Sequence, residues 1–181
     1  KLGVVIAATD ELNVFAAWGH GFRMPSEGQL FRQGRALSSL TLAPVKADNF
    51  EVGANMRLLD RVRVELAAYH MRKHDDLLSF VHDDGSTETM NAGETLHRGV
   101  EVGTTVALPG DIGLDVAWSH ALHTYEEWIT GTGADLSGNV MEDAPRNTGS
   151  VSLAWTPRRW TGVHAAVEAQ RIGSYWMDAG S

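Results

Sequence analysis

The sequence of 181 residues has no cysteine and no apolar run long enough for a membrane helix. Without cysteine the chain forms neither disulfides nor thiolate metal sites. A membrane helix needs about 20 consecutive apolar residues, so helical spanning is excluded. Basic residues are also scarce, with 15 Lys and Arg against 23 Asp and Glu and a formal net charge of -8. Because phosphate binding needs a basic surface, this balance disfavours nucleic acid as a partner.

Recognisable catalytic motifs are absent as well: the sequence has no Gly-x-Ser-x-Gly, no His-Glu-x-x-His and no phosphate-binding glycine loop. Two histidine pairs are closely spaced, His70 with His74 and His120 with His123. In a strand, residues three apart lie on opposite faces, and residues four apart are separated by about 13 Å. We therefore expect no catalytic residue, no metal site and no cofactor in this chain.

Alternation of apolar and polar residues is the main positive signal. Every second residue from Phe50 to Leu58 is apolar, and the interleaved positions include Glu51 and Arg57. This period of two predicts a strand rather than a helix. The run over 45–59 is far longer than the five or six residues typical of strands in soluble sheets. A long strand with one apolar and one charged face is typical of a protein that separates lipid from water.

Eight strand-like runs follow one another along the chain: 1–8, 12–22, 45–59, 62–80, 94–108, 112–128, 146–156 and 161–173. The connections between them alternate between short and long. Strands that alternate in direction place all tight turns at one rim of a sheet and all long loops at the other. The predicted fold is therefore all-β, an antiparallel up-and-down transmembrane β-barrel.

The two alternating series are expected to face different environments. The apolar series is expected to face lipid: Phe50, Val52, Ala54, Met56, Leu58, Val100, Val102, Leu114, Val116, Leu153 and Val167. The polar series is expected to face the lumen: Glu51, Asn55, Arg57, Glu101, Asp115 and Glu168.

Aromatic residues and glycines add two further expectations. Four tryptophans near the ends of the runs are expected to form girdles at the membrane interfaces: Trp128, Trp155, Trp160 and Trp176. Three glycines fall on the lumen series: Gly53, Gly99 and Gly103. Glycine in a strand marks a bend or the close approach of another backbone.

Three motifs connect these runs to a known family. They are the stretch from Leu42 to Gly53, with Gly21 to Ser26 before it, then Asn91-Ala92-Gly93, then Arg98 to Glu101. In this order and spacing they resemble the barrel of TonB-dependent outer-membrane receptors of the siderophore-receptor type. The resemblance implies that residues 1–181 are about eight strands from the C-terminal half of a plugged barrel of about 22 strands. The plug domain, the TonB box and the closing strands are expected to lie outside this chain.

The resemblance also implies a function, which is active import of a scarce solute across the outer membrane of a Gram-negative bacterium. The expected ligand is a ferric siderophore, with cobalamin or another metal chelate as the alternative. Energy would come through TonB, which contacts the plug, and the barrel would contact outer-membrane lipid and lipopolysaccharide. No enzymatic activity is implied.

Ligand contacts are expected in the long external loops. Ferric siderophores are often anionic, and guanidinium groups pair with their oxygens at two points. The candidate ligand-binding residues are Arg23, Arg32, Arg35, His82, Tyr125 and Trp128. The acidic pairs Asp75-Asp76 and Glu126-Glu127 near these loops are expected to be solvated and to face lipopolysaccharide, or to shape the vestibule for a cationic or metal-loaded ligand.

Two alternatives of other classes remain open. A complete small outer-membrane barrel would act as an anchor or adhesin, and its interior would be filled by interlocking charged side chains. A soluble all-β binding module would pack the apolar series against a second sheet.

Overall fold

The computed structural model describes residues 1–31, 42–81, 84–91, 93–129 and 133–177. They form ten strands and one short helix: β1 (Leu2–Ala7), β2 (Leu12–Arg23), α1 (Glu27–Leu30), β3 (Val45–Leu58), β4 (Val62–His74), β5 (Leu77–Val81), β6 (Thr87–Asn91), β7 (Glu94–Leu108), β8 (Ile112–Glu127), β9 (Asn147–Trp155) and β10 (Ala165–Ile172). Among these residues, no helix has the length and apolar character needed to cross a membrane.

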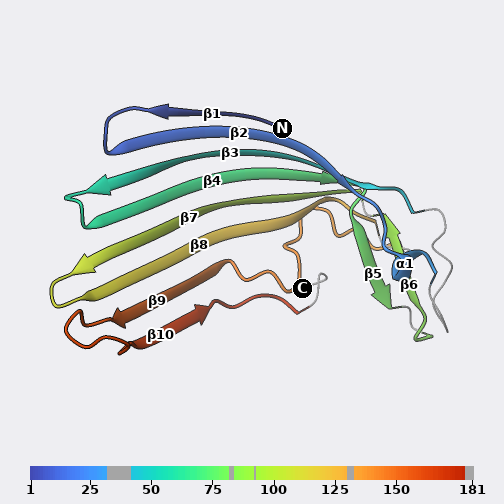
Figure 1. Cartoon of the computed structure of the whole chain (residues 1–181). Helices are drawn as coiled ribbons and strands as arrows, with labels where there is room; N and C mark the ends of the chain where they lie inside the picture. The colour runs from blue at the N-terminus through green and yellow to red at the C-terminus, as the bar shows by residue number, and fades with distance from the viewer. Residues whose placement is uncertain (32–41, 82–83, 92, 130–132, 178–181) are drawn as a thin grey trace.

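Eight of the strands form one antiparallel sheet in the order β1-β2-β3-β4-β7-β8-β9-β10. Figure 1 shows this sheet as a single curved layer, with tight turns at one end and α1, β5 and β6 at the other. We call these ends the turn rim and the long-loop rim. The predicted antiparallel up-and-down architecture is confirmed. The sheet is open, because in the part of the chain that the structure describes β1 pairs only with β2 and β10 only with β9.

Residues with positive φ produce the tight turns. Leu59 and Asp60 have φ of 52° and 53°, and the Arg61 amide donates to the Leu58 carbonyl over 3.2 Å. Two successive positive φ values give the hairpin turn whose twist matches that of the strands. The turn between β7 and β8 contains Gly110 and Asp111, whose φ values are 83° and 62°.

Two of the predicted boundaries were wrong. The run 62–80 is interrupted after His74, because Asp75 adopts a φ of 59° and turns the chain out of the sheet. Residues beyond it pair as a separate β5–β6 hairpin at the long-loop rim (Figure 1). Most of β5 had been predicted to continue the strand, and β6 lies where a loop had been predicted. The last run begins at Ala165 rather than at residue 161, since Gly162 adopts a φ of 86° within the preceding turn.

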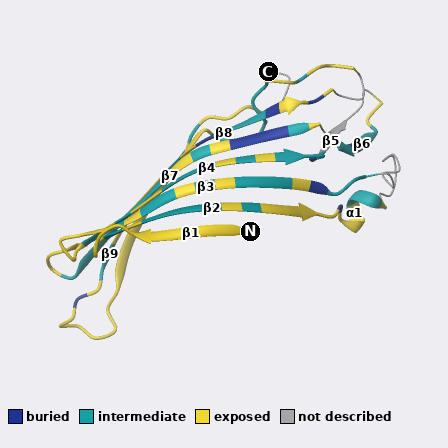
Figure 2. Cartoon of the chain, turned by 90° about the horizontal axis from the view of Figure 1, so that it is seen from above, coloured by how far each residue is buried: buried dark blue, intermediate teal, exposed yellow. Residues whose placement is uncertain are grey.

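The apolar series does not pack against a second sheet. Seven of its eleven members are exposed: Phe50, Val52, Leu58, Val100, Val116, Leu153 and Val167. The other four are half-buried: Ala54, Met56, Val102 and Leu114. Figure 2 shows the buried residues mainly toward the long-loop rim, including parts of β7 and β8 and the start of β3. This distribution contradicts the soluble sandwich, and the two unpaired edges contradict a closed eight-stranded barrel.

The tryptophans occupy both rims, with one correction. Trp155 and Trp160 pack edge to face at the turn rim, with ring centroids 5.6 Å apart. Trp128 is only 4% exposed and packs inside a loop, so its predicted place in a girdle was wrong. Trp18 and Trp118, which had not been predicted, are exposed on the apolar face.

Two of the lumen-series glycines are covered by aromatic side chains of the same sheet. The ring of Phe15 lies over Gly53, and the side chain of Tyr69 lies over Gly99. In both cases the aromatic residue is the direct cross-strand partner of the glycine. At these two glycines, the position of a Cβ would also lie close to a backbone carbonyl of a neighbouring strand, that of Leu66 at Gly53 and that of His120 at Gly99.

Candidate functional site at the long-loop rim

Five polar residues form a contiguous group at the long-loop rim, which we call the rim cluster: Lys73, Asp76, Thr95, His97 and His123. Antiparallel register brings them together, because Lys73 pairs with Thr95 and His97 pairs with His123. Alternate residues of a strand share a face, so Thr95 and His97 project from the same side of β7. This is the polar side that carries Glu101.

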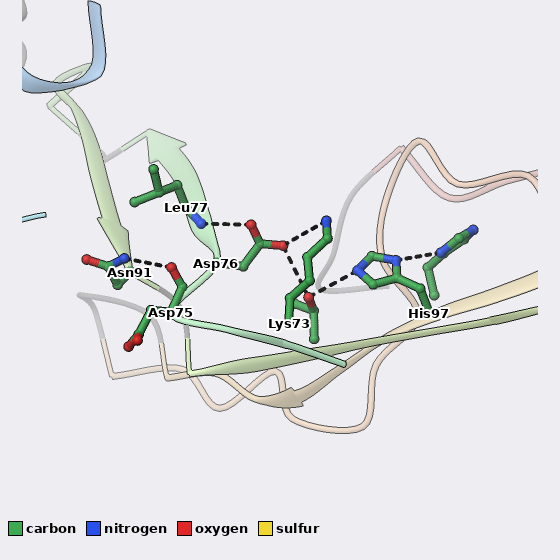
Figure 3. A network of polar contacts seen from close by, with 8 residues as sticks. Lys73, Asp75, Asp76, Leu77, Asn91 and His97 are labelled. Carbon is green, nitrogen blue, oxygen red and sulfur yellow. Dashed lines mark hydrogen bonds and ion pairs between the residues drawn. The ribbon is translucent and has the colours of Figure 1, made fainter. Parts of the chain in front are cut away.

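A chain of hydrogen bonds connects the rim cluster (Figure 3). Asp76 Oδ2 accepts from Thr95 Oγ1 over 3.1 Å and from Lys73 Nζ over 3.3 Å. Thr95 Oγ1 lies 3.1 Å from His97 Nε2, and His97 Nδ1 lies 2.7 Å from His123 Nδ1.

Donor and acceptor rules assign the tautomers of this chain. An ionised carboxylate only accepts, so the Thr95 hydroxyl donates its proton to Asp76 and accepts from His97 Nε2–H. His97 Nδ1 therefore carries a lone pair, which accepts from His123 Nδ1–H.

The rim cluster lies beyond the apolar band of the outer wall. On the apolar face that band ends at Val100 and Trp118, and the next outward positions are Arg98 and His120. His97 is 7% exposed. Burial, followed by the positive charge of Lys73 and by His123, lowers the pKa of His97 to about 4, although Asp76 opposes this shift. Burial and Lys73 also lower the pKa of His123. Both imidazoles are therefore neutral at pH 7.

Asp76 corrects one sequence-based expectation. The pair Asp75-Asp76 was expected to be solvated, yet Asp76 is only 5% exposed. Its carboxylate also accepts from the Leu77 amide over 3.0 Å, so it fixes the start of β5 as well as the rim cluster (Figure 3).

Two cavities adjoin on the polar face. One, of about 440 Å³, lies beside the rim cluster and is lined by residues that include His97, His123, Met141 and Glu142. The other, of about 720 Å³, lies further along the same face against Glu51, Asn55, Glu65 and Glu101. Ser119 and Thr148 line both cavities. The two cavities therefore run from the long-loop rim down the inner side of the sheet.

The predicted ligand-binding residues that the structure describes do not gather in one place. Arg23 is exposed at the end of β2, whereas Arg32, Arg35 and His82 lie outside the described residues. The other two, Tyr125 and Trp128, form a small core inside the connection after β8.

That core is tightly held. The rings of Tyr125 and Trp128 lie 4.3 Å apart between centroids, and the Tyr125 hydroxyl donates to Glu142 Oε2 over 2.6 Å. Burial and this hydrogen bond raise the pKa of Tyr125. Tyr125 has no exposed surface. In this conformation it supports the loop, and its contact with a ligand stays a prediction.

The six predicted lumen residues lie at different depths. Glu51, Asn55 and Glu101 line the larger cavity. Asp115 accepts from Thr105 Oγ1 over 2.8 Å beside a separate cavity of about 250 Å³. Arg57 donates to the Asp10 carbonyl over 3.4 Å at the turn rim, and Glu168 accepts from Gln170 over 2.7 Å.

The motif residue Asn91 joins three segments at this rim. Its side-chain oxygen accepts from the Ala43 amide over 2.8 Å, and its Nδ2 donates to the Ala43 carbonyl over 3.0 Å and to the Asp75 carbonyl over 2.6 Å. Gly93 follows at a point where a Cβ would collide with the backbone and side chain of Glu127. These two motif positions therefore tie the loops to the sheet.

Sequence reasoning missed the His97–His123 pair because it compared only histidines close in sequence. The turn after β7 contains the signal that was needed. Leu108 pairs with Ile112, and each step away from this turn pairs the next two residues. His97 lies eleven residues before Leu108 and His123 eleven after Ile112, so the two are partners. Within the described ranges, no group of three or more His, Cys, Asp or Glu converges on a metal position.

Comparisons with solved structures show that this sheet has the fold of part of several receptors. The ferric-catecholate import receptor Fiu from E. coli K12 aligns with a TM-score of 0.68 and 16% identity, over 96% of this chain and 24% of that chain. BauA, the ferric preacinetobactin receptor from Acinetobacter baumannii, gives a TM-score of 0.66 and 17% identity, over 98% and 26%. The ferric yersiniabactin uptake receptor FyuA from Yersinia pestis gives 0.62 and 18%, over 98% and 26%. At these identities the similarity shows the fold, and the chain spans about a quarter of each receptor.

A family model, described as TonB dependent receptor-like, beta-barrel, matches residues 1–181. The family consists of transport receptors rather than enzymes, and its members reside in the outer membrane of Gram-negative bacteria. The curved sheet, its apolar outer face and its long-loop rim agree with that match. The chain belongs to the family of TonB-dependent receptor β-barrels.

Proposed function

We propose that the protein imports a scarce metal chelate across the outer membrane, with energy supplied through TonB. A ferric siderophore is the first candidate for this chelate. The observation that supports this best is the pair of adjoining cavities that lead from the long-loop rim along the polar face. Fiu, BauA and FyuA are each named as receptors for a ferric ligand. A sheet with lipid on one side and a polar wall on the other suits passage of such a solute.

The coupling to TonB would act through a plug domain, and the sequence 1–181 would contribute part of one barrel. In this arrangement the loop arginines Arg23, Arg32 and Arg35 recognise the anionic groups of the chelate, and His82 contributes a further polar contact. Tyr125 and Trp128 shape the vestibule from within the loop. The outward apolar series contacts lipid, and the exposed long-loop rim contacts lipopolysaccharide.

Uptake of radiolabelled ferric chelates by cells that carry the full-length protein tests this function. We expect uptake of one chelate to disappear when the gene is deleted and when TonB is inactivated. Arg23→Ala should weaken uptake at low chelate concentration. Arg158→Ala is the matched control, because Arg158 lies at the turn rim, where it pairs with Asp111 at 3.1 Å. Uptake that continues without TonB would refute the proposal.

A second candidate ligand class is a chelate of a metal other than iron, or cobalamin. OprC, named as a copper transporter, aligns with a TM-score of 0.67 and 18% identity, over 84% of this chain and 23% of that chain. The imidazole pair of the rim cluster favours a metal chelate within this class.

A further inference from the structure

We propose that His97 and His123 form a binding site for a divalent transition-metal ion that arrives in a chelate with open coordination positions. This inference rests on the second candidate ligand class of the proposed function, a chelate of a metal other than iron, as the source of the metal. Both side chains line the cavity of about 440 Å³ at the long-loop rim.

The position between the two rings is suited to a metal. His97 Nδ1 and His123 Nδ1 lie 2.7 Å apart, and the hydrogen-bond chain leaves the lone pair of His97 Nδ1 aimed at the proton of His123. Two imidazole nitrogens on a tetrahedral ion lie about 3.3 Å apart. Replacing the shared proton with a metal therefore requires the nitrogens to separate by about 0.6 Å. The two rings, whose centroids lie 4.9 Å apart, must also turn so that both lone pairs meet at the metal. His123 is only partly buried, which leaves room for this shift.

The groups behind His97 have the arrangement of a supported metal ligand. A metal-binding imidazole usually donates its other N–H to a carboxylate or another oxygen, which fixes its tautomer and orientation. Here Nε2–H of His97 donates to Thr95 Oγ1, which in turn donates to Asp76. Thr95 is fully buried, so this support is shielded from water.

The charges around the cavity admit a cation. Lys73 is paired with Asp76, with Nζ 3.3 Å from Oδ2, but its positive charge is offset only in part, because it still lowers the pKa of both imidazoles. Glu142 and Asp143 line the same cavity and add negative charge, and Met141 adds a thioether sulfur.

The donor set defines the class of metal. Imidazole suits Cu²⁺, Ni²⁺ and Zn²⁺, and affinity along the first transition row peaks at Cu²⁺. Two protein nitrogens leave at least two positions of a tetrahedral ion to the chelate. A siderophore that fills every coordination position of Fe³⁺ with oxygen leaves none for an imidazole. The site therefore selects for a chelate whose metal ion has open coordination positions.

Titration of the purified full-length protein with Cu²⁺, followed by electron paramagnetic resonance, tests the site. We expect two nitrogen couplings in the wild type and one in either His97→Gln or His123→Gln. The control is His120→Gln on the same strand, because His120 lies on the opposite face and bonds to Asn147 Oδ1 over 2.9 Å. This variant should keep both couplings. Heat modifiability on gels verifies that each variant is folded.

Substitutions of Thr95 test separately whether the hydrogen bonds from Asp76 through Thr95 orient the His97 imidazole. Thr95→Val removes the hydroxyl that orients His97, and we expect Cu²⁺ affinity to fall about 10- to 100-fold while both nitrogen couplings remain. Thr95→Ser restores the hydroxyl and should restore the affinity.

Measurements of Cu²⁺ binding and of uptake distinguish a failure of the proposed metal site from a failure of the proposed import function. An unchanged Cu²⁺ spectrum and affinity in the folded double variant His97→Gln/His123→Gln would overturn the metal site, whatever the transport result. Cu²⁺ binding that depends on both histidines, without any TonB-dependent uptake, would retain the site and refute the import function.

Discussion

The hydroxyl of Tyr69 lies over Gly99, its cross-strand partner, where a Cβ on Gly99 would be 2.8 Å from that hydroxyl and 2.8 Å from the His120 carbonyl. Phe15 covers Gly53 in the same way. An aromatic ring that lies flat over a strand glycine shields the exposed backbone and pins the register. Gly53 and Gly99 therefore leave the space that the neighbouring side chains of Phe15 and Tyr69 occupy.

The first prediction compares two glycines on the same face of β7. Gly99→Ala should destabilise the barrel by about 1 to 3 kcal/mol, because the added methyl group collides with backbone and with Tyr69. Gly103→Ala is the control, since a Cβ there meets Glu65 at 3.7 Å, an ordinary contact. Urea unfolding of the full-length protein in lipid vesicles measures both. Equal destabilisation by the two variants would contradict this account.

The sheet could be predicted from the sequence because strand alternation and tight turns are local properties. The β5–β6 hairpin could not, because apolar residues resume in the same phase after His74, at Leu78 and Phe80, and so resemble a continuation of the preceding strand. Its cause is the positive φ of Asp75, a conformation that no glycine signals at this position. That conformation depends on contacts with distant residues, since the Asp75 amide donates to the Gly93 carbonyl over 3.0 Å.

The candidate site was less predictable than the sheet. The rim cluster joins residues up to 50 positions apart, from Lys73 to His123, and only the strand register relates them. Tyr125 and Trp128 were selected as loop aromatics, and their burial follows from how the connection after β8 folds back on itself. A loop residue's exposure depends on this packing, which sequence alternation does not encode.

The second prediction concerns Asn91. Asn91→Asp keeps the shape of the side chain but replaces its amide donor with an oxygen that faces the carbonyls of Ala43 and Asp75. Losing a partner costs about 1 to 3 kcal/mol for each group left unsatisfied. Hydrogen exchange should accelerate at Ala43 and at the start of β3. Asn147→Asp is the matched control, because Asn147 uses its Oδ1 as an acceptor for His120, and an aspartate retains that oxygen. Similar exchange in the two variants would argue against the role of Asn91.

The third prediction tests the outer wall. Val102 belongs to the apolar series and pairs with Leu66 and Trp118, which are 42% and 43% exposed. Val102→Arg should destabilise the barrel, because a cation on the lipid face costs about 2 to 4 kcal/mol at the bilayer midplane and less toward the interfaces. Thr105→Ser on the polar face should cost little, because the serine hydroxyl retains the hydrogen bond to Asp115. Refolding into vesicles at increasing urea compares the two. A negligible penalty at Val102 would mean that this face does not contact lipid.

The last prediction concerns the edges of the sheet. In the described residues β1 and β10 each pair on one side only, so both edges present N–H and C=O groups without a strand partner. Lipid cannot satisfy such groups, and each costs several kcal/mol when it is left unpaired in the hydrocarbon region. An exposed edge also pairs readily with other chains. The 181-residue chain expressed by itself should therefore aggregate on refolding into detergent, whereas the full-length protein should give a heat-modifiable monomer. A heat-modifiable monomer with β-type circular dichroism from the isolated chain would contradict this, because it would require β1 and β10 to close on each other. Closure at eight strands needs an interior filled by side chains. Here the polar face instead carries cavities of about 720 and 440 Å³.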